Sequence, residues 1–219
     1  MRFPEFLKKN GTIGFVAPSF GCNREPYKTS FEHALEKFHS MGYQTTLGPN
    51  CFEGSGIGIS NTPEKCAAEL NKMYLSDEAD AIISCGGGEL MCEILDDVDF
   101  DAIKAANPKW YMGYSDNTNF TFLLTTICDV ASIYGPCAGT FGMEPWDESI
   151  EDCFSLFTGK KLTMQSYQLW EKEGLRDEEH PLEPYNLTEQ SLVRSFMTKK
   201  DQAGEVQAFE TEGNIEFKG

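Results

Sequence analysis

The sequence has no long apolar run. Its longest apolar stretches, at residues 13–18 and 120–127, fall far short of the roughly 20 residues that a membrane-spanning helix needs. The amino-terminal segment contains basic residues but lacks the apolar core and the small-residue cleavage site of a secretory signal peptide. These absences predict a protein without a membrane span and with a cytoplasmic location.

Positive charge is also scarce. Only 18 lysine and arginine residues stand against 35 aspartate and glutamate residues, which gives a formal net charge of −17. Such a charge repels the phosphate backbone of nucleic acids, which binding proteins attract with clustered Lys and Arg. Nucleic acid is therefore not an expected partner, and the acidic residues are interpreted as a solvated surface.

Metal-binding motifs are missing as well. The three histidines have neither HExxH nor zinc-finger spacing, and the eight cysteines form no CxxC pair. A chain of 219 residues can bury a core without disulfides, so these cysteines are expected to be reduced and mostly buried. We expect no metal and no cofactor.

One acidic stretch invites comparison with a calcium loop, because Asp97, Asp99 and Asp101 alternate along it. Ala102, however, stands where such a loop requires its turn glycine, and Pro108 stands where it requires a bidentate glutamate. The stretch is therefore interpreted as the solvated start of a helix.

What the chain does contain, up to Gly142, is an alternation of short apolar runs with helical periodicity. Phe31, Ala34, Leu35 and Phe38, for example, recur at the spacing of an amphipathic helix. Such alternation is typical of an α/β domain with a largely parallel sheet. The expected strands are 12–17, 43–47, 79–85 and 110–114, and the expected helices are 27–41, one that starts at Thr62 and Pro63, and 117–129.

The pattern weakens after Gly142. Residues 171–189 are charged and contain proline, as a connection between domains would, and short strand-like runs follow at 192–197 and 206–209. We expect an α/β domain with the functional residues at 1–142, a connection at 143–190, and the start of an incomplete, β-rich carboxy-terminal domain at 191–219.

Ser115 is the strongest candidate for a catalytic residue. It lies in GYSDNT, residues 113–118, where an apolar strand turns into an amphipathic helix. Such a turn exposes the hydroxyl beside the N–H groups of the helix start, as in a nucleophile elbow. Asn117 stands where the GxSxG pattern has its second glycine. The alternative is that Ser115 or Asp116 only caps the helix.

A second candidate is the glycine run Gly86–Gly88, followed by Glu89, at the end of the third expected strand. Open α/β sheets bind ligands at such strand ends, and glycines let backbone N–H groups approach a substrate oxygen closely. The run matches neither GxGxxG nor GxxxxGK[ST], so a nucleotide phosphate site has little support. An ordinary tight turn is the alternative.

Together with their neighbours, these elements resemble the LD-carboxypeptidase family, which includes the microcin C immunity peptidases. The matching elements follow the family's order from about Gly11 to Gly142. They are GFVAPS at 14–19, Thr62-Pro63-Glu64, the glycine pair at 86–87, Pro108-Lys109, GYSDNT at 113–118 and Tyr134-Gly135-Pro136.

The resemblance implies a flavodoxin-like or Rossmann-like α/β domain and a serine peptidase. Ser115 would be the nucleophile, and the backbone N–H groups of Gly87 and Asp116 would bind the oxyanion. Relatives have an arginine before the glycine pair and an aromatic residue after it, whereas this chain has Cys85 and Gly88. The difference leaves the substrate open.

The resemblance also implies a catalytic glutamate and histidine from a carboxy-terminal domain. None of His33, His39 and His180 matches that histidine. The chain is therefore expected to end before both residues and to be nearly inactive by itself. The segment from Gly142 to Gly219, including Trp170, is closer to the microcin-immunity branch.

The resulting interpretation is a serine carboxypeptidase that hydrolyses an amide bond in a small peptide, such as an LD-linked muropeptide, through an acyl-enzyme on Ser115. Hydrolysis of a peptidyl-nucleotide conjugate is the first alternative. A non-catalytic α/β domain that binds a small anion is the second. Apolar surface left uncovered in the second domain would also allow a homodimer.

Overall fold

The computed structural model describes residues 1–192, 195–200 and 202–211, and they form two compact units. The first comprises Met1–Gln165 and Gly174–Tyr185, and the second comprises Ser166–Glu173 and the described residues from Asn186 onward. The first unit thus extends past Gly142 into the region expected to be a connection. Residues 193, 194, 201 and 212–219 of the expected carboxy-terminal domain lie outside the described residues.

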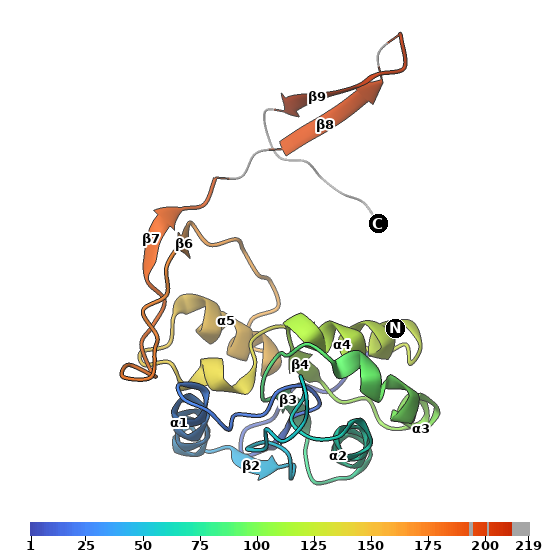
Figure 1. Ribbon diagram of the computed structural model, residues 1–219, viewed down its shortest axis with the longest axis vertical. Helices are drawn as coiled ribbons and strands as arrows, with labels where there is room; N and C mark the ends of the chain where they lie inside the picture. The colour runs from blue at the N-terminus through green and yellow to red at the C-terminus, as the bar shows by residue number, and fades with distance from the viewer. Residues whose placement is uncertain (193–194, 201, 212–219) are drawn as a thin grey trace. The chain divides into compact units, whose positions relative to one another are not determined.

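A five-stranded parallel sheet forms the centre of the first unit (Figure 1). Its strands are β1 (Thr12–Val16), β2 (Gln44–Leu47), β3 (Ala81–Ser84), β4 (Tyr111–Gly113) and β5 (Ile133–Tyr134), in the order β2-β1-β3-β4-β5. This is the strand order of flavodoxin-like sheets, so the expected α/β class is confirmed. The order reverses between β1 and β3, where such sheets bind ligands beyond the carboxyl ends of the strands.

Helices cover both faces of this sheet (Figure 1). One face packs against α1 (Tyr27–Ser40) and α5 (Glu148–Phe157), and the other against α2 (Pro63–Leu75), α3 (Phe100–Ala105) and α4 (Thr118–Thr126). The connections after β3, β4 and β5 contain the 3₁₀ helices η1 (Met91–Asp97), η2 (Ser115–Asn117) and η3 (Ala138–Gly142).

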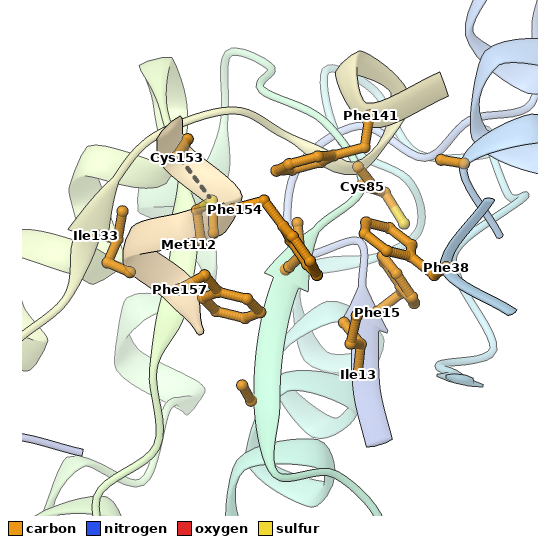
Figure 2. Packing of buried hydrophobic residues seen from close by; sticks show 14 of the residues in the cluster. Ile13, Phe15, Phe38, Cys85, Met112, Ile133, Phe141, Cys153, Phe154 and Phe157 are labelled. Carbon is orange, nitrogen blue, oxygen red and sulfur yellow. Dashed lines mark hydrogen bonds between the residues drawn. The ribbon is translucent and has the colours of Figure 1, made fainter. Parts of the chain in front are cut away.

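The side chains of β1 alternate between two hydrophobic clusters, as the twofold period of a strand requires. Ile13 and Phe15 join the cluster with α1 and α5, whereas Val16 joins the cluster on the α2 face. Phe154 of α5 packs against Phe38 of α1 with ring centroids 5.6 Å apart (Figure 2). Helix α5, which was not among the expected helices, therefore completes the core.

The expected helix starts are confirmed, with one difference in capping. Pro63 is the first residue of α2 and Thr62 occupies the N-cap position, but the Thr62 side chain makes no capping hydrogen bond. Asp99 does cap α3, because its carboxylate accepts a hydrogen bond from the N–H of Ala102 at 2.9 Å. The acidic stretch is thus a helix start, as expected.

The described part of the second unit consists of antiparallel strand pairs. Strand β6 (Leu169–Glu171) pairs with β7 (Leu187–Gln190), and β8 (Ser195–Lys200) pairs with β9 (Val206–Thr211). The runs expected at 192–197 and 206–209 correspond to β8 and β9, with β8 beginning later than expected.

The cysteines are unpaired, and all except Cys92 are buried, as the sequence predicts. In the described part of the chain, no helix combines the length and the apolar character needed to cross a membrane.

Candidate active site

A cavity of about 600 Å³ in the first unit contains both sequence-predicted sites, Ser115 and the Gly86–Gly88 loop. Its volume lies in the range of small-molecule sites. The segments that follow all five strands of the sheet contribute to the lining. They are residues 20–27 after β1, 53–59 after β2, 85–89 after β3, 114–115 after β4 and 137–140 after β5.

Ser115 occupies a strained turn between β4 and α4. Its φ angle is +61°, in the left-handed region that few residues other than glycine adopt. Its N–H donates to the phenol oxygen of Tyr134 at 3.1 Å, and the hydroxyl of Thr118 donates to its carbonyl oxygen at 2.6 Å. The side chain is exposed to the cavity. The exposure expected of an elbow serine is thus confirmed, and the positive φ shows that its backbone is also strained.

Asn117 shows how the turn is held although it departs from GxSxG. Its fully buried Nδ2 donates to the carbonyl oxygens of Gly86 at 2.8 Å and Tyr114 at 3.1 Å. Its Oδ1 accepts a hydrogen bond from the Tyr111 hydroxyl at 2.5 Å. One amide therefore joins β4, the serine turn and the glycine loop, a role that the sequence did not indicate.

Asp116 ties the same turn to three further segments. Its carboxylate accepts hydrogen bonds from the Ser19 hydroxyl at 2.5 Å, the Met91 N–H at 2.8 Å and the Asn119 side chain at 3.0 Å. Neither η2 nor α4 has a side-chain hydrogen bond at its N-cap. Capping, the alternative interpretation of Ser115 and Asp116, is therefore not what their side chains do.

Gly87 lies directly against the Ser115 hydroxyl. A Cβ on Gly87 would be 3.3 Å from Ser115 Oγ and 3.1 Å from Ser115 Cβ. The Gly87 carbonyl accepts a hydrogen bond from the Phe20 N–H at 2.9 Å. The N–H groups of Gly87 and Asp116 donate to no other described residue. Their joint binding of one oxyanion stays a prediction.

Three cysteines also line the cavity, but they are poor nucleophiles. Burial raises the pKa of the Cys137 thiol to about 12 and that of Cys85 well above its ordinary value. Cys22 is buried and directs its S–H to the carbonyl oxygen of Cys85. Because the thiolate is the reactive form, the raised pKa values argue against Cys85 and Cys137 as nucleophiles.

None of the three histidines lines the cavity. Each ring has another neighbour: His33 Nδ1 lies 2.8 Å from the Gly142 carbonyl oxygen, His39 Nε2 lies 2.7 Å from Thr45 Oγ1, and His180 Nδ1 lies 3.0 Å from Asp177 Oδ1. The structure therefore gives them no place beside Ser115, in agreement with the sequence.

The part of the sequence that forms these strands and loops matches a known protein family. The family model described as the LD-carboxypeptidase N-terminal domain matches residues 13–135. The chain belongs to the LD-carboxypeptidase family. The match includes Ser115 and the glycine loop, and it confirms the resemblance found in the sequence.

Two relatives illustrate the range of LD-carboxypeptidase-like proteins. The probable murein peptide carboxypeptidase of Bacillus subtilis is 29% identical over 140 residues, which are 63% of this chain and 41% of that protein. The microcin C7 self-immunity protein MccF of Escherichia coli is 32% identical over 169 residues, which are 76% of this chain and 48% of that protein. The chain thus spans about half the length of the curated relatives it matches.

A solved structure supports the same assignment. MccF in complex with aspartyl sulfamoyl adenosine is similar to this chain with a TM-score of 0.76 and 25% identity, over 90% of this chain and 59% of that one. This member of the LD-carboxypeptidase family therefore shares its α/β fold with MccF.

Proposed function

We propose that this protein is a serine carboxypeptidase that hydrolyses an amide bond in a small peptide, such as an LD-linked muropeptide, through an acyl-enzyme on Ser115. The observation that carries the proposal is the strained, exposed Ser115 with Gly87 packed against its hydroxyl. Membership of the LD-carboxypeptidase family supports the same reaction.

In the proposed reaction, a base takes the proton from Ser115 Oγ, and the oxygen attacks the carbonyl carbon of the scissile amide. The N–H groups of Gly87 and Asp116 would donate to the oxyanion that forms. Collapse of this intermediate breaks the C–N bond, and the amine leaves with the proton. Water then attacks the ester on Ser115, which frees the carboxylic acid and restores the hydroxyl.

The reaction also needs a base, and no histidine lines the cavity among the described residues. The resemblance implies a glutamate and a histidine of a carboxy-terminal domain. Because a serine hydroxyl is a weak nucleophile without its base, we expect this chain alone to hydrolyse an LD-tetrapeptide several powers of ten more slowly than a form that contains both residues. Comparable rates, both abolished by Ser115→Ala, would contradict this expectation.

Covalent labelling tests the nucleophile directly. We expect a fluorophosphonate to modify Ser115 selectively, slowly in this chain, with the adduct located by peptide mass spectrometry. Ser115→Ala should abolish the adduct. Ser40→Ala, at an exposed serine of α1, is the matched control and should leave it unchanged. Labelling that persists in Ser115→Ala would refute the proposed role.

A second candidate function is hydrolysis of a peptidyl-nucleotide conjugate. It is favoured by the similarity to MccF, whose solved structures include complexes with aspartyl sulfamoyl adenosine and glutamyl sulfamoyl guanosine. Assays of an LD-tetrapeptide and of an aminoacyl sulfamoyl nucleoside on the same protein distinguish the two. Tight binding of a small anion that Ser115→Ala leaves unchanged, without hydrolysis of either compound, would favour a binding protein instead.

A further inference from the structure

More acidic than basic side chains line the cavity. Glu25, Glu53 and Glu89 line it together with two arginines, Arg24 and Arg176. A negatively charged ligand group is therefore repelled by three side chains and attracted by two. Arg24 is exposed, whereas Arg176 is partly buried.

Arg176 is supported by an aromatic ring rather than by a carboxylate. Its guanidinium carbon lies over the Tyr27 ring, 5.4 Å from the ring centroid. Within the described ranges it forms no ion pair. Its charge also acts on the residue before the nucleophile: burial raises the pKa of the Tyr114 phenol, and Arg176 opposes that shift. Among the described residues, Arg176 is thus packed against Tyr27 and has no carboxylate within ion-pair distance.

The chemistry of this cation favours a carboxylate. A guanidinium that packs over an aromatic face keeps its N–H edge free, and that edge matches both oxygens of a carboxylate. In a peptide, the terminal carboxylate lies only about one residue, roughly 3.8 Å of chain, beyond the last amide bond. Since Ser115 and Arg176 line one cavity, the last amide bond and the chain end can enter it together.

We propose that Arg176 binds the free α-carboxylate of the terminal residue that the enzyme releases, with Tyr27 orienting the guanidinium. The proposal rests on the proposed action of Ser115 and makes Arg176 a specificity-determining residue. The substrate class is a peptide with a free carboxyl end, and an amide bond inside a longer chain would leave Arg176 without its partner.

Equilibrium binding tests this assignment without requiring turnover. The Ser115→Ala protein is titrated in a calorimeter with N-acetyl-L-alanyl-D-alanine, once as the free acid and once as its carboxy-terminal amide. We expect the acid to bind tighter by roughly 10- to 100-fold, the range of a charge-assisted hydrogen bond. Addition of Arg176→Gln should reduce this ratio to about one, and Arg176→Lys, which keeps the charge but loses the planar fork, should give an intermediate ratio.

Three variants control for indirect effects. Arg24→Gln makes the same change in the same cavity and should preserve the acid preference. Tyr27→Phe keeps the ring and should also preserve it, whereas Tyr27→Leu removes the ring and should weaken binding of the acid but not of the amide. Far-ultraviolet circular dichroism verifies that each variant is folded.

Equal affinity for acid and amide, no binding of either, or an acid preference that survives Arg176→Gln would overturn the proposal. Failure of the peptidase proposal is distinguishable from these results. A protein whose Ser115 resists labelling but whose acid preference depends on Arg176 would retain the carboxylate site and lose only the proposed catalysis.

Discussion

Replacing Asn117 by aspartate tests the amide that joins the serine turn to the glycine loop. The substitution keeps the shape of the side chain but exchanges its Nδ2 donor for an oxygen. The carbonyl oxygens of Gly86 and Tyr114, which now accept hydrogen bonds at 2.8 and 3.1 Å, would each face another acceptor.

The expected loss of stability for Asn117→Asp follows from these two contacts. Each carbonyl keeps one other donor, the Ser84 hydroxyl for Gly86 at 3.0 Å and the Asn117 N–H for Tyr114 at 3.3 Å. The substitution therefore removes two hydrogen bonds without orphaning either acceptor, and at about 0.5–1.5 kcal/mol each their loss costs about 1–3 kcal/mol. Burial raises the pKa of the introduced carboxyl, and its protonated form can donate one hydrogen bond back. Since the folded-state pKa is then above the unfolded value, the variant is most stable below the ordinary aspartate pKa. It loses stability as the pH rises through the raised pKa.

Urea unfolding followed by far-ultraviolet circular dichroism measures this loss, because helices α1–α5 all lie in the first unit. Asn10→Asp is the matched control. Asn10 is exposed in a left-handed turn with φ +63°, and its replacement should change the free energy of unfolding by less than about 0.5 kcal/mol. An equally small effect of Asn117→Asp at neutral pH would refute the reasoning.

Glu69 of α2 is buried, and its carboxylate accepts hydrogen bonds from the N–H groups of Ala17 and Asn50, each at 2.8 Å. Glu69→Gln turns an amide donor toward one of them and should cost about 1–3 kcal/mol at neutral pH in urea unfolding. Burial raises the pKa of Glu69 above 4.5, so the stability that its protonation adds is fully present below that value and is lost as the pH rises through the raised pKa, while the two hydrogen bonds remain; the same pH slope in Glu69→Gln would disprove this origin. Ser115→Gly relieves a left-handed conformation that costs other residues about 1–2 kcal/mol, so its melting temperature should exceed that of Ser115→Ala although both abolish labelling. Gly87→Ala would place a methyl group 3.3 Å from Ser115 Oγ and should slow labelling at least about tenfold in a folded protein, whereas an unchanged rate would argue against a close approach of residue 87 to the reacting hydroxyl.

The first four strands and their helices were predictable because their apolar residues follow the period of the element that each forms. Helix α5 carries the same signal, since Ile150, Cys153, Phe154 and Phe157 recur at helical spacing and all are buried. Asp147 even caps it by accepting a hydrogen bond from the Ser149 N–H at 2.9 Å. The surrounding acidic residues and Pro145 obscured a helix that the periodicity alone would have located.

The candidate site was only partly predictable. The strand-to-helix transition identified Ser115, and the strand end identified the glycine loop, because both are local features of the chain. The role of Asn117 depends on a carbonyl 31 residues away in the sequence, and the position of Arg176 depends on its contact with Tyr27. Such contacts follow from the fold and leave no local pattern.

The amide of Asn117 has a consequence for how the site can vary among related proteins. By fixing the glycine loop to the serine turn, it would preorganise the nucleophile and the oxyanion donors before any substrate arrives, so no binding energy is spent in bringing them together. The side chains at 20–27 and 53–59 line the same cavity without taking part in the Asn117 hydrogen bonds, although backbone hydrogen bonds join Phe20 to Gly87 and Glu89 to Gly58. Substitutions there can change which ligand is accepted without altering the geometry of the reacting centre, which makes the substrate preference of this fold easier to evolve than its chemistry.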